Sequence, residues 1–128
     1  MKLTLTDKQA QVVSEALELF SRLGMGQYDR LRDRIHNSLW GEADEQLFKT
    51  AEDALRRLSL PDFMSRHPGS SWGIRSPEIS DAYRIAYDMH QVVRNKLFMS
   101  LPEGERRPGH VNGWPPMQSG AEPLPEVE

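Results

Sequence analysis

Apolar residues recur three or four positions apart along much of this chain, which is the spacing of one face of an α-helix. The first such stretch follows Thr6 and Gln9, two residues with the spacing of a capping box, and reaches Gly24, which is expected to end the helix in the left-handed conformation. The pattern therefore predicts a helix over residues 7–23. Its apolar positions are Ala10, Val13, Ala16, Leu17, Phe20 and Leu23.

Three later stretches show the same spacing. A second helix is expected from Tyr28 to near Trp40, a third within about residues 43–58 ahead of Pro61, and a fourth from the N-cap Ser80 to a point before Pro102. The fourth has the longest stripe, Ala82, Ile85, Ala86, Met89, Val93 and Leu97, and is expected at the centre of the core. We predict an all-α fold of four main helices.

Two regions lack this periodicity. Residues 60–80 form a long Gly/Ser/Pro loop before the fourth helix, and loops of this length are usually functional or disordered. Six of the nine prolines and four of the nine glycines lie after Leu101, which argues against regular helix there. The sequence thus predicts a helical domain at 1–101 and an extended or disordered tail at 102–128. Because Trp114 is costly to leave in water, part of this tail could instead lie across the body or a neighbouring subunit.

Composition narrows the functional classes. The chain has 128 residues, 38% of them hydrophobic, and a formal net charge of −3, so one domain with a modest core is expected and nucleic acid is a poor partner. There is no cysteine, and no apolar run has the length of a membrane span or signal peptide. These features favour a cytoplasmic protein with no membrane partner. A core this small is not expected to bury all of the tryptophans. Burial of the remainder between subunits favours a homo-oligomer, most simply a dimer.

The glycine- and serine-rich loop 68–77 is the first candidate site. Glycines let the backbone approach a ligand, amides near a helix start favour negative charge, and an arginine adds a fork of donors. A phosphate-bearing ligand could contact Ser70, Ser71 and Arg75 while a base stacks on Trp72. Alternatively, Trp72 fills the core and the glycines only permit a tight reversal.

A smaller glycine turn is the second candidate. Arg22, Gly24, Gly26 and Gln27 place a cation, two flexible residues and an amide where two helices meet, so Arg22 could share an anion with Arg75. The same residues also suit a plain helix-turn-helix hinge that needs no ligand.

One face of the fourth helix is the third candidate. Tyr83, Tyr87, His90 and Arg94 are spaced four, three and four apart and so share a side of the helix. That face could line a cleft, in which Tyr87 stacks, His90 donates a hydrogen bond and Arg94 meets negative charge. It could equally form the seam of a dimer or an ordinary surface.

Catalytic and metal motifs are not found. The four histidines have no spacing that places two ligands on one helical turn, and Asp88 and His90 diverge along their helix. We therefore expect no metal, no cofactor and no enzymatic activity. The basic residues Arg30, Arg32, Arg34, Arg56 and Arg57 are interspersed with acidic ones and are interpreted as solvated helix faces rather than a DNA-reading surface.

Several segments together resemble a small uncharacterised protein family of tailed bacteriophages and prophages. The residues that carry this resemblance are 16–27, 69–74, 77–79 and 86–94, and it extends from about Leu5 to Leu97, with a further match at residues 119–125. The resemblance implies a phage accessory protein, a class that often counters host defences, and implies no catalytic residue.

Two functional hypotheses follow. In the first, the protein is a non-catalytic binder whose two glycine loops and fourth helix enclose and sequester a small phosphate-bearing or nucleotide-like molecule. The resemblance implies that this molecule is a host defence signal. In the second, it is an inhibitor or assembly factor that docks on a host or phage protein, such as a defence protein, through its helix faces and its proline-rich tail containing Trp114 and Met117. An enzyme acting on nucleotides has the weakest support.

Overall fold

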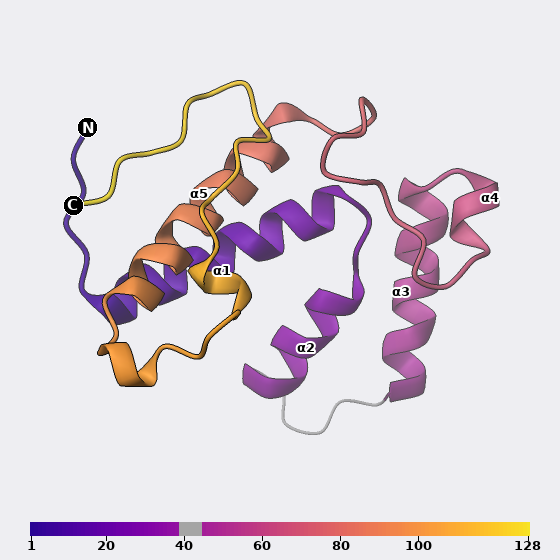
Figure 1. Ribbon diagram of the computed structural model, residues 1–128. Helices are drawn as coiled ribbons and strands as arrows, with labels where there is room; N and C mark the ends of the chain where they lie inside the picture. Colours follow the sequence, from indigo (N-terminus) through magenta and orange to yellow (C-terminus); the bar gives the residue numbers. More distant parts are fainter. Residues whose placement is uncertain (39–44) are drawn as a thin grey trace. The chain divides into compact units, whose positions relative to one another are not determined.

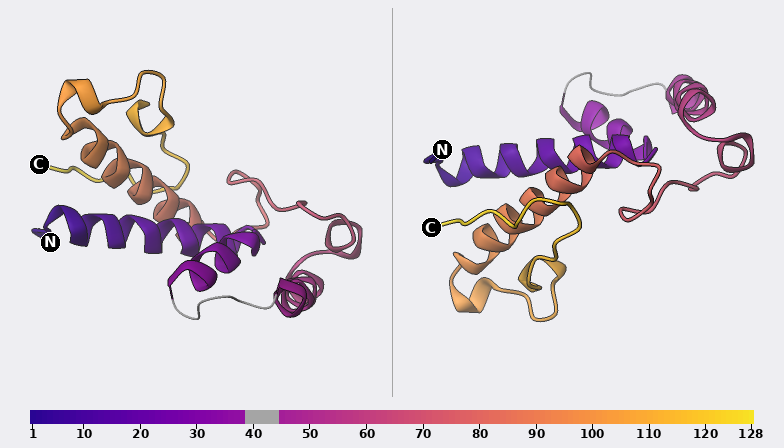
Figure 2. Two further views of the ribbon diagram at one scale, coloured as in Figure 1. Left: turned by 90° about the horizontal axis from the view of Figure 1, so that it is seen from below. Right: turned by 90° about the horizontal axis from the view of Figure 1, so that it is seen from above.

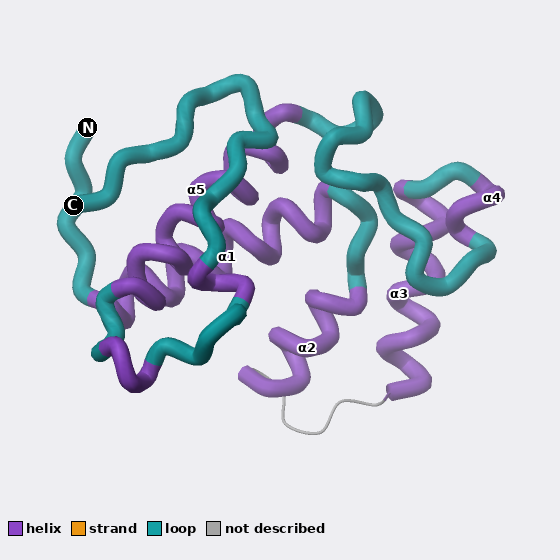
Figure 3. The backbone as a smooth tube through the Cα atoms, in the orientation of Figure 1, coloured by secondary structure: helices purple, strands orange, loops and turns teal. Residues whose placement is uncertain are grey.

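The computed structural model describes residues 1–38 and 45–128, with side chains for 1–34 and 45–128. The described residues form α-helices, two 3-10 turns and no β-strand, which confirms the all-α class (Figures 1 and 3). None of their helices combines the length and apolar character needed to cross a bilayer. The elements are α1 (Asp7–Gly24), α2 (Asp29–Ser38), α3 (Glu45–Ser59), α4 (Asp62–Ser65), α5 (Asp81–Met99), η1 (Glu103–Glu105) and η2 (Val111–Gly113).

The helix count differs from the expected four because one turn of helix, α4, lies within the loop that follows Pro61. A helix of one turn is too short to show a periodic apolar pattern, so no pattern in the sequence predicts it. The expected end of the second helix near Trp40 and the start of the third near residue 43 lie outside the described residues.

The helix caps follow local rules. Thr6 and Gln9 form the predicted capping box, in which the Thr6 amide donates to Gln9 Oε1 at 2.9 Å and the Gln9 amide to Thr6 Oγ1 at 3.3 Å. The expectation of a left-handed Gly24 is wrong, because Gly24 ends α1 and Gly26 has the positive φ, of 80°. The amides of Gly26 and Gln27 donate to the Leu23 and Arg22 carbonyls at 3.0 Å each, which is the Schellman arrangement.

The chain divides into two compact units: residues 1–21 with 80–128, and residues 22–79. In the first unit, α1 packs beside α5 (Figure 2). Ser14 of α1 contacts His90 of α5, and the rings of Phe20 and Tyr83 lie 4.9 Å apart. Residues 102–128 group with this unit, and residues between 112 and 121 are hydrogen-bonded to α5. Trp114, which was expected to avoid water, is nevertheless 63% exposed.

The interior of the first unit is polar. The most buried residues of α1 are Ser14 and Ser21 rather than the predicted apolar stripe, and Phe20 is exposed. On α5, Ala86 is buried as predicted, but it is accompanied by three polar side chains. These are Asp88, His90 and Gln91.

The second unit has a small apolar centre and one buried charge. Met25, Leu60 and Ile79 are buried, and a Cβ added to Gly26 would lie 2.8 Å from Leu60 Cδ2, so this turn packs closely on Leu60. Arg56 of α3 is also buried. The interpretation of Arg56 as part of a solvated face is therefore wrong, whereas its neighbour Arg57 is exposed as expected.

Candidate functional site

A row of polar side chains on α5 is the most developed binding surface of the first unit. Asp81, Asp88, Gln91 and Asn95 are spaced seven, three and four apart, which keeps them on one side of the helix. We call these four residues the polar track. They contact residues 112–121 of the segment that follows η1, and we call residues 110–121 the strap.

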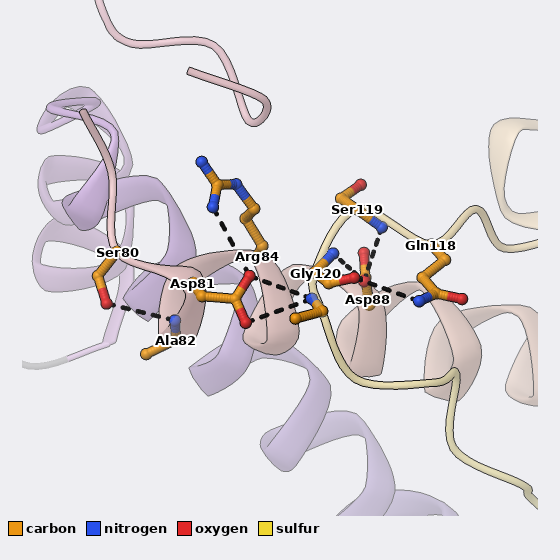
Figure 4. Close-up of polar contacts among 9 residues, drawn as sticks. Ser80, Asp81, Ala82, Arg84, Asp88, Gln118, Ser119 and Gly120 are labelled. Carbon is orange, nitrogen blue, oxygen red and sulfur yellow. Dashed lines mark hydrogen bonds and ion pairs between the residues drawn. The ribbon is translucent and has the colours of Figure 1, made fainter. Parts of the chain in front are cut away.

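Asp88 makes the shortest contacts with the strap. Its Oδ2 accepts hydrogen bonds from the Ser119 and Gly120 amides, both at 2.7 Å, and the residue is only 3% exposed (Figure 4). Hydrogen bonds to an ionised acceptor are stronger than neutral ones, and burial limits competition from water. Asp88 therefore fixes the strap at two successive amides.

Asp81 extends this pattern by one residue. The Ala121 amide donates to both of its carboxylate oxygens, at 3.1 and 3.2 Å, and Arg84 lies 3.6 Å from Oδ1 (Figure 4). Ser80 caps the helix just before it by accepting from the Ala82 amide, as the sequence predicted. Two acidic residues two turns apart thus hold three consecutive strap amides.

Amide side chains hold the other half of the strap. Gln91 Nε2 donates to the Met117 carbonyl at 3.1 Å while the Met117 amide donates to Gln91 Oε1 at 3.4 Å. Asn95 Nδ2 donates to the Asn112 and Trp114 carbonyls, at 2.9 and 3.1 Å. Asparagine and glutamine suit this task because each carries donors and an acceptor.

Gly120 allows the strap to approach the helix closely. A Cβ at this position would lie 3.0 Å from Ile85 Cγ1, 3.1 Å from the Ile85 backbone nitrogen and 3.4 Å from the Arg84 carbonyl carbon. Backbone atoms of a helix cannot move aside as the end of a flexible side chain can. A side chain at 120 would therefore require the strap or α5 to shift.

The strap turns two large apolar side chains toward solvent. Trp114 is 63% exposed and Met117 64%, although their main chains are held by Asn95 and Gln91. Trp114 has φ −76° and ψ 143°, the polyproline II conformation, and two prolines follow it. The result is a short, pre-shaped segment with exposed apolar side chains.

In the second unit, the two glycine loops meet. Arg22 Nη1 donates to Gln27 Oε1 at 2.8 Å, and Gln27 Nε2 donates to Ser71 Oγ at 3.1 Å. The Trp72 amide donates at 2.9 Å to the carbonyl of Met25, the residue between the two glycines of the turn. Of the predicted ligand residues, Arg22, Gln27, Ser71 and Trp72 are thus brought together around the turn.

The donors predicted for an anion are partly occupied by the protein itself. The amides of Ser70 and Trp72 donate to the His67 and Met25 carbonyls. Trp72 is half-buried, between the two alternatives of stacking face and core plug, and Arg75 is exposed. The ligand-binding role of these residues stays a prediction.

Arg56 holds the loop through contacts that the sequence pattern does not predict. The residue is 4% exposed, and its guanidinium donates to the carbonyls of Ser70 at 2.9 Å, Met64 at 3.0 Å and His67 at 2.8 Å. The planar fork of arginine suits several acceptors at once. In the sequence, Arg56 is simply an arginine on α3 ahead of a loop rich in turn residues. Many exposed arginines have the same context, so it does not predict burial.

The remaining predicted residues lie on α5 in the first unit. His90 is buried, and its Nδ1 lies 2.9 Å from both Oγ and the carbonyl oxygen of Ser14, so it joins α5 to α1. Tyr87, whose ring lies 6.1 Å from that of His90, and Arg94 are half-buried. No group of acidic or histidine side chains within the described part of the chain could hold a metal ion.

No known family model matches the chain, and no curated protein or solved structure shows significant similarity to it. These comparisons therefore give no support to the resemblance to phage proteins.

Proposed function

We propose that the protein is a non-catalytic protein-binding module that presents Trp114, Pro115, Pro116 and Met117 to a partner. The observation that carries this proposal is the contrast between a held main chain and free side chains: α5 binds the backbone at Trp114 and Met117 while both side chains remain largely exposed. A segment already fixed in its bound shape loses less conformational entropy on association. Tryptophan is also the residue type most enriched at binding hot spots.

The chemistry of the segment defines the partner. Polyproline II segments bind in grooves lined by aromatic side chains, where the apolar residues beside the prolines occupy pockets. The chain carries Glu122, Glu126 and Glu128 after the strap and no lysine or arginine after Arg107. A partner groove with a basic rim would complement this charge. That the partner belongs to a phage or its host, and that both meet in the cytoplasm, rests on the resemblance and the composition described above.

The experiment compares variants that change one exposed side chain each. The partner captured by the wild-type protein from its source cells is purified and titrated against Trp114→Ala, Met117→Ala and, as a control, Leu58→Ala, an exposed apolar position in the second unit. We expect Trp114→Ala to weaken binding about 30-fold, the loss typical of a hot spot, and Leu58→Ala to have little effect. Binding that depends on Leu58 but not on Trp114 would contradict the proposal and assign recognition to α3.

A small anionic ligand is the second candidate, favoured by the hydrogen bonds that join Arg22, Gln27 and Ser71 across the two glycine loops. Arg75 is exposed in the same unit and could supply the positive charge for such a ligand. Calorimetric titration with cyclic nucleotides and ADP-ribose derivatives tests this candidate. Heat that disappears in Arg75→Ala supports it, whereas no heat with any of these compounds rejects it.

A further inference from the structure

We propose that the polar track of α5 is a binding site for extended polypeptide, and that the strap of a second copy of this chain is its occupant in trans. The strap fills this site within one chain in the structure, and the identical segment of a second copy carries the same groups. This inference uses the contacts between strap and helix. It does not depend on a partner for Trp114.

The track recognises main-chain atoms. The hydrogen bonds from Asp81 and Asp88 end on the amides of residues 119–121, and those from Gln91 and Asn95 end on main-chain groups of residues 112, 114 and 117. Such contacts do not distinguish a segment within the same chain from the same segment supplied by another chain. The acceptors and donors of α5 are equally suited to both.

Gly120 makes the site selective despite this main-chain recognition. Any other residue at 120 would place its Cβ 3.1 Å from the Ile85 backbone nitrogen, a tight contact, so glycine fits best at the position that faces Asp88. A second copy supplies glycine in the required register.

The connection between α5 and the strap permits the exchange. Residues 101–109 are exposed apart from Arg106, and they include Gly104 and Gly109, whose φ is 71°. Exchange of an identical element between copies through such a connection is a common route to dimers. Because a tethered strap has an effective concentration of the order of millimolar, the segment of the same chain occupies the site in dilute solution.

A labelled peptide tests whether the site accepts a strap in trans. A fluorescent peptide of residues 110–123 is titrated into full-length wild type, Gly120→Ala and Gly104→Ala, with anisotropy as the readout. In Gly120→Ala the strap of the same chain fits poorly, so we expect this host to bind the native peptide about tenfold more tightly than wild type does. Gly104 has open space where a Cβ would be added and an ordinary φ, so Gly104→Ala should behave as wild type.

Two variants of the peptide separate this proposal from the proposed function. A peptide with Gly120→Ala should bind every host more weakly than the native peptide, whereas one with Trp114→Ala should bind as the native peptide does. Equal binding of the native peptide to all three hosts would overturn the peptide site. Light scattering tests the second copy: we expect wild type to form dimers near about 1 mM, and a wild type that stays monomeric there would overturn the assignment of the occupant.

Discussion

The two units hold their irregular segments by opposite chemistry. In the first unit, carboxylates of α5 accept hydrogen bonds from the amides of the strap, with Asp88 at its centre. In the second, the guanidinium of Arg56 on α3 donates to the carbonyls of the loop after α4. In both cases a buried charge on a long helix replaces the regular hydrogen bonds that these segments lack, because buried backbone polar groups must find partners.

Arg56→Met breaks the cationic half of this comparison, and we expect the largest effect from it. The substitution keeps much of the volume but leaves three carbonyls without their donor, so it should reduce the free energy of unfolding by about 3 kcal/mol. Urea denaturation measures the change. Arg57→Met, on the exposed neighbour, is the matched control and should change stability by less than about 0.5 kcal/mol. Equal effects of the two would show that Arg56 does not hold the loop.

Asp88→Ala breaks the anionic half. Because the freed amides of Ser119 and Gly120 can reach water when the strap detaches, we expect a smaller loss, of about 2 kcal/mol. Hydrogen exchange of these two amides should accelerate strongly, while exchange in the core of α1 changes little. Asp53→Ala, an exposed aspartate on α3, serves as the control. Unchanged exchange at residues 119 and 120 would refute the role assigned to Asp88.

Two glycines of the second unit separate backbone strain from packing. Gly26 and Gly69 have nearly the same φ, 80° and 81°, but only Gly26 has a neighbour, Leu60, within reach of an added Cβ. Alanine at either site should cost about 1 kcal/mol from strain. At Gly26 the crowding should add about 1 kcal/mol more. Thermal unfolding of the two variants measures this difference, and identical midpoints would mean that Leu60 moves aside.

Two buried serines of α1 test whether a buried hydroxyl needs a hydrogen-bond partner to stabilise the first unit. Ser21 Oγ is buried with no hydrogen-bond partner among the described residues, whereas Ser14 Oγ contacts His90. Ser21→Ala should therefore raise the free energy of unfolding by about 0.5 kcal/mol, through relief of desolvation and better helix propensity. Ser14→Ala should lower it by about 1 kcal/mol. Effects of the same sign would contradict this distinction.

The sequence predicted what local physics determines. The long helices, the Thr6 capping box and the Ser80 cap all depend on residues within a few positions of one another, and the structure confirms them. The left-handed residue was placed two positions early because Gly24 and Gly26 both suit a C-cap. The chain adopts the left-handed conformation at Gly26, where the turn packs closely on Leu60, a residue distant in sequence.

The polar interactions were hard to predict because their partners lie far apart in the sequence. Asp88 and Gln91 sit beside an apolar stripe and bind residues 26 to 32 positions later, and Arg56 reaches carbonyls 8 to 14 positions away. Every residue has a carbonyl and every residue except proline has an amide N–H, so the sequence carries no mark of which ones a side chain will bind. Gln27 and Ser71, both predicted to contact a ligand, are hydrogen-bonded to each other, and their ligand-binding role stays a prediction.

The paired hydrogen bonds between Gln91 and Met117 reproduce one rung of a β-ladder, with a side-chain amide in place of a second strand. An extended segment with unpaired amides is a template for strand addition and aggregation. Here the amides of residues 117 and 119–121 are already bonded to α5, so the helix shields the segment from intermolecular sheet formation. For this part of the strap, α5 thus takes the place of a neighbouring strand.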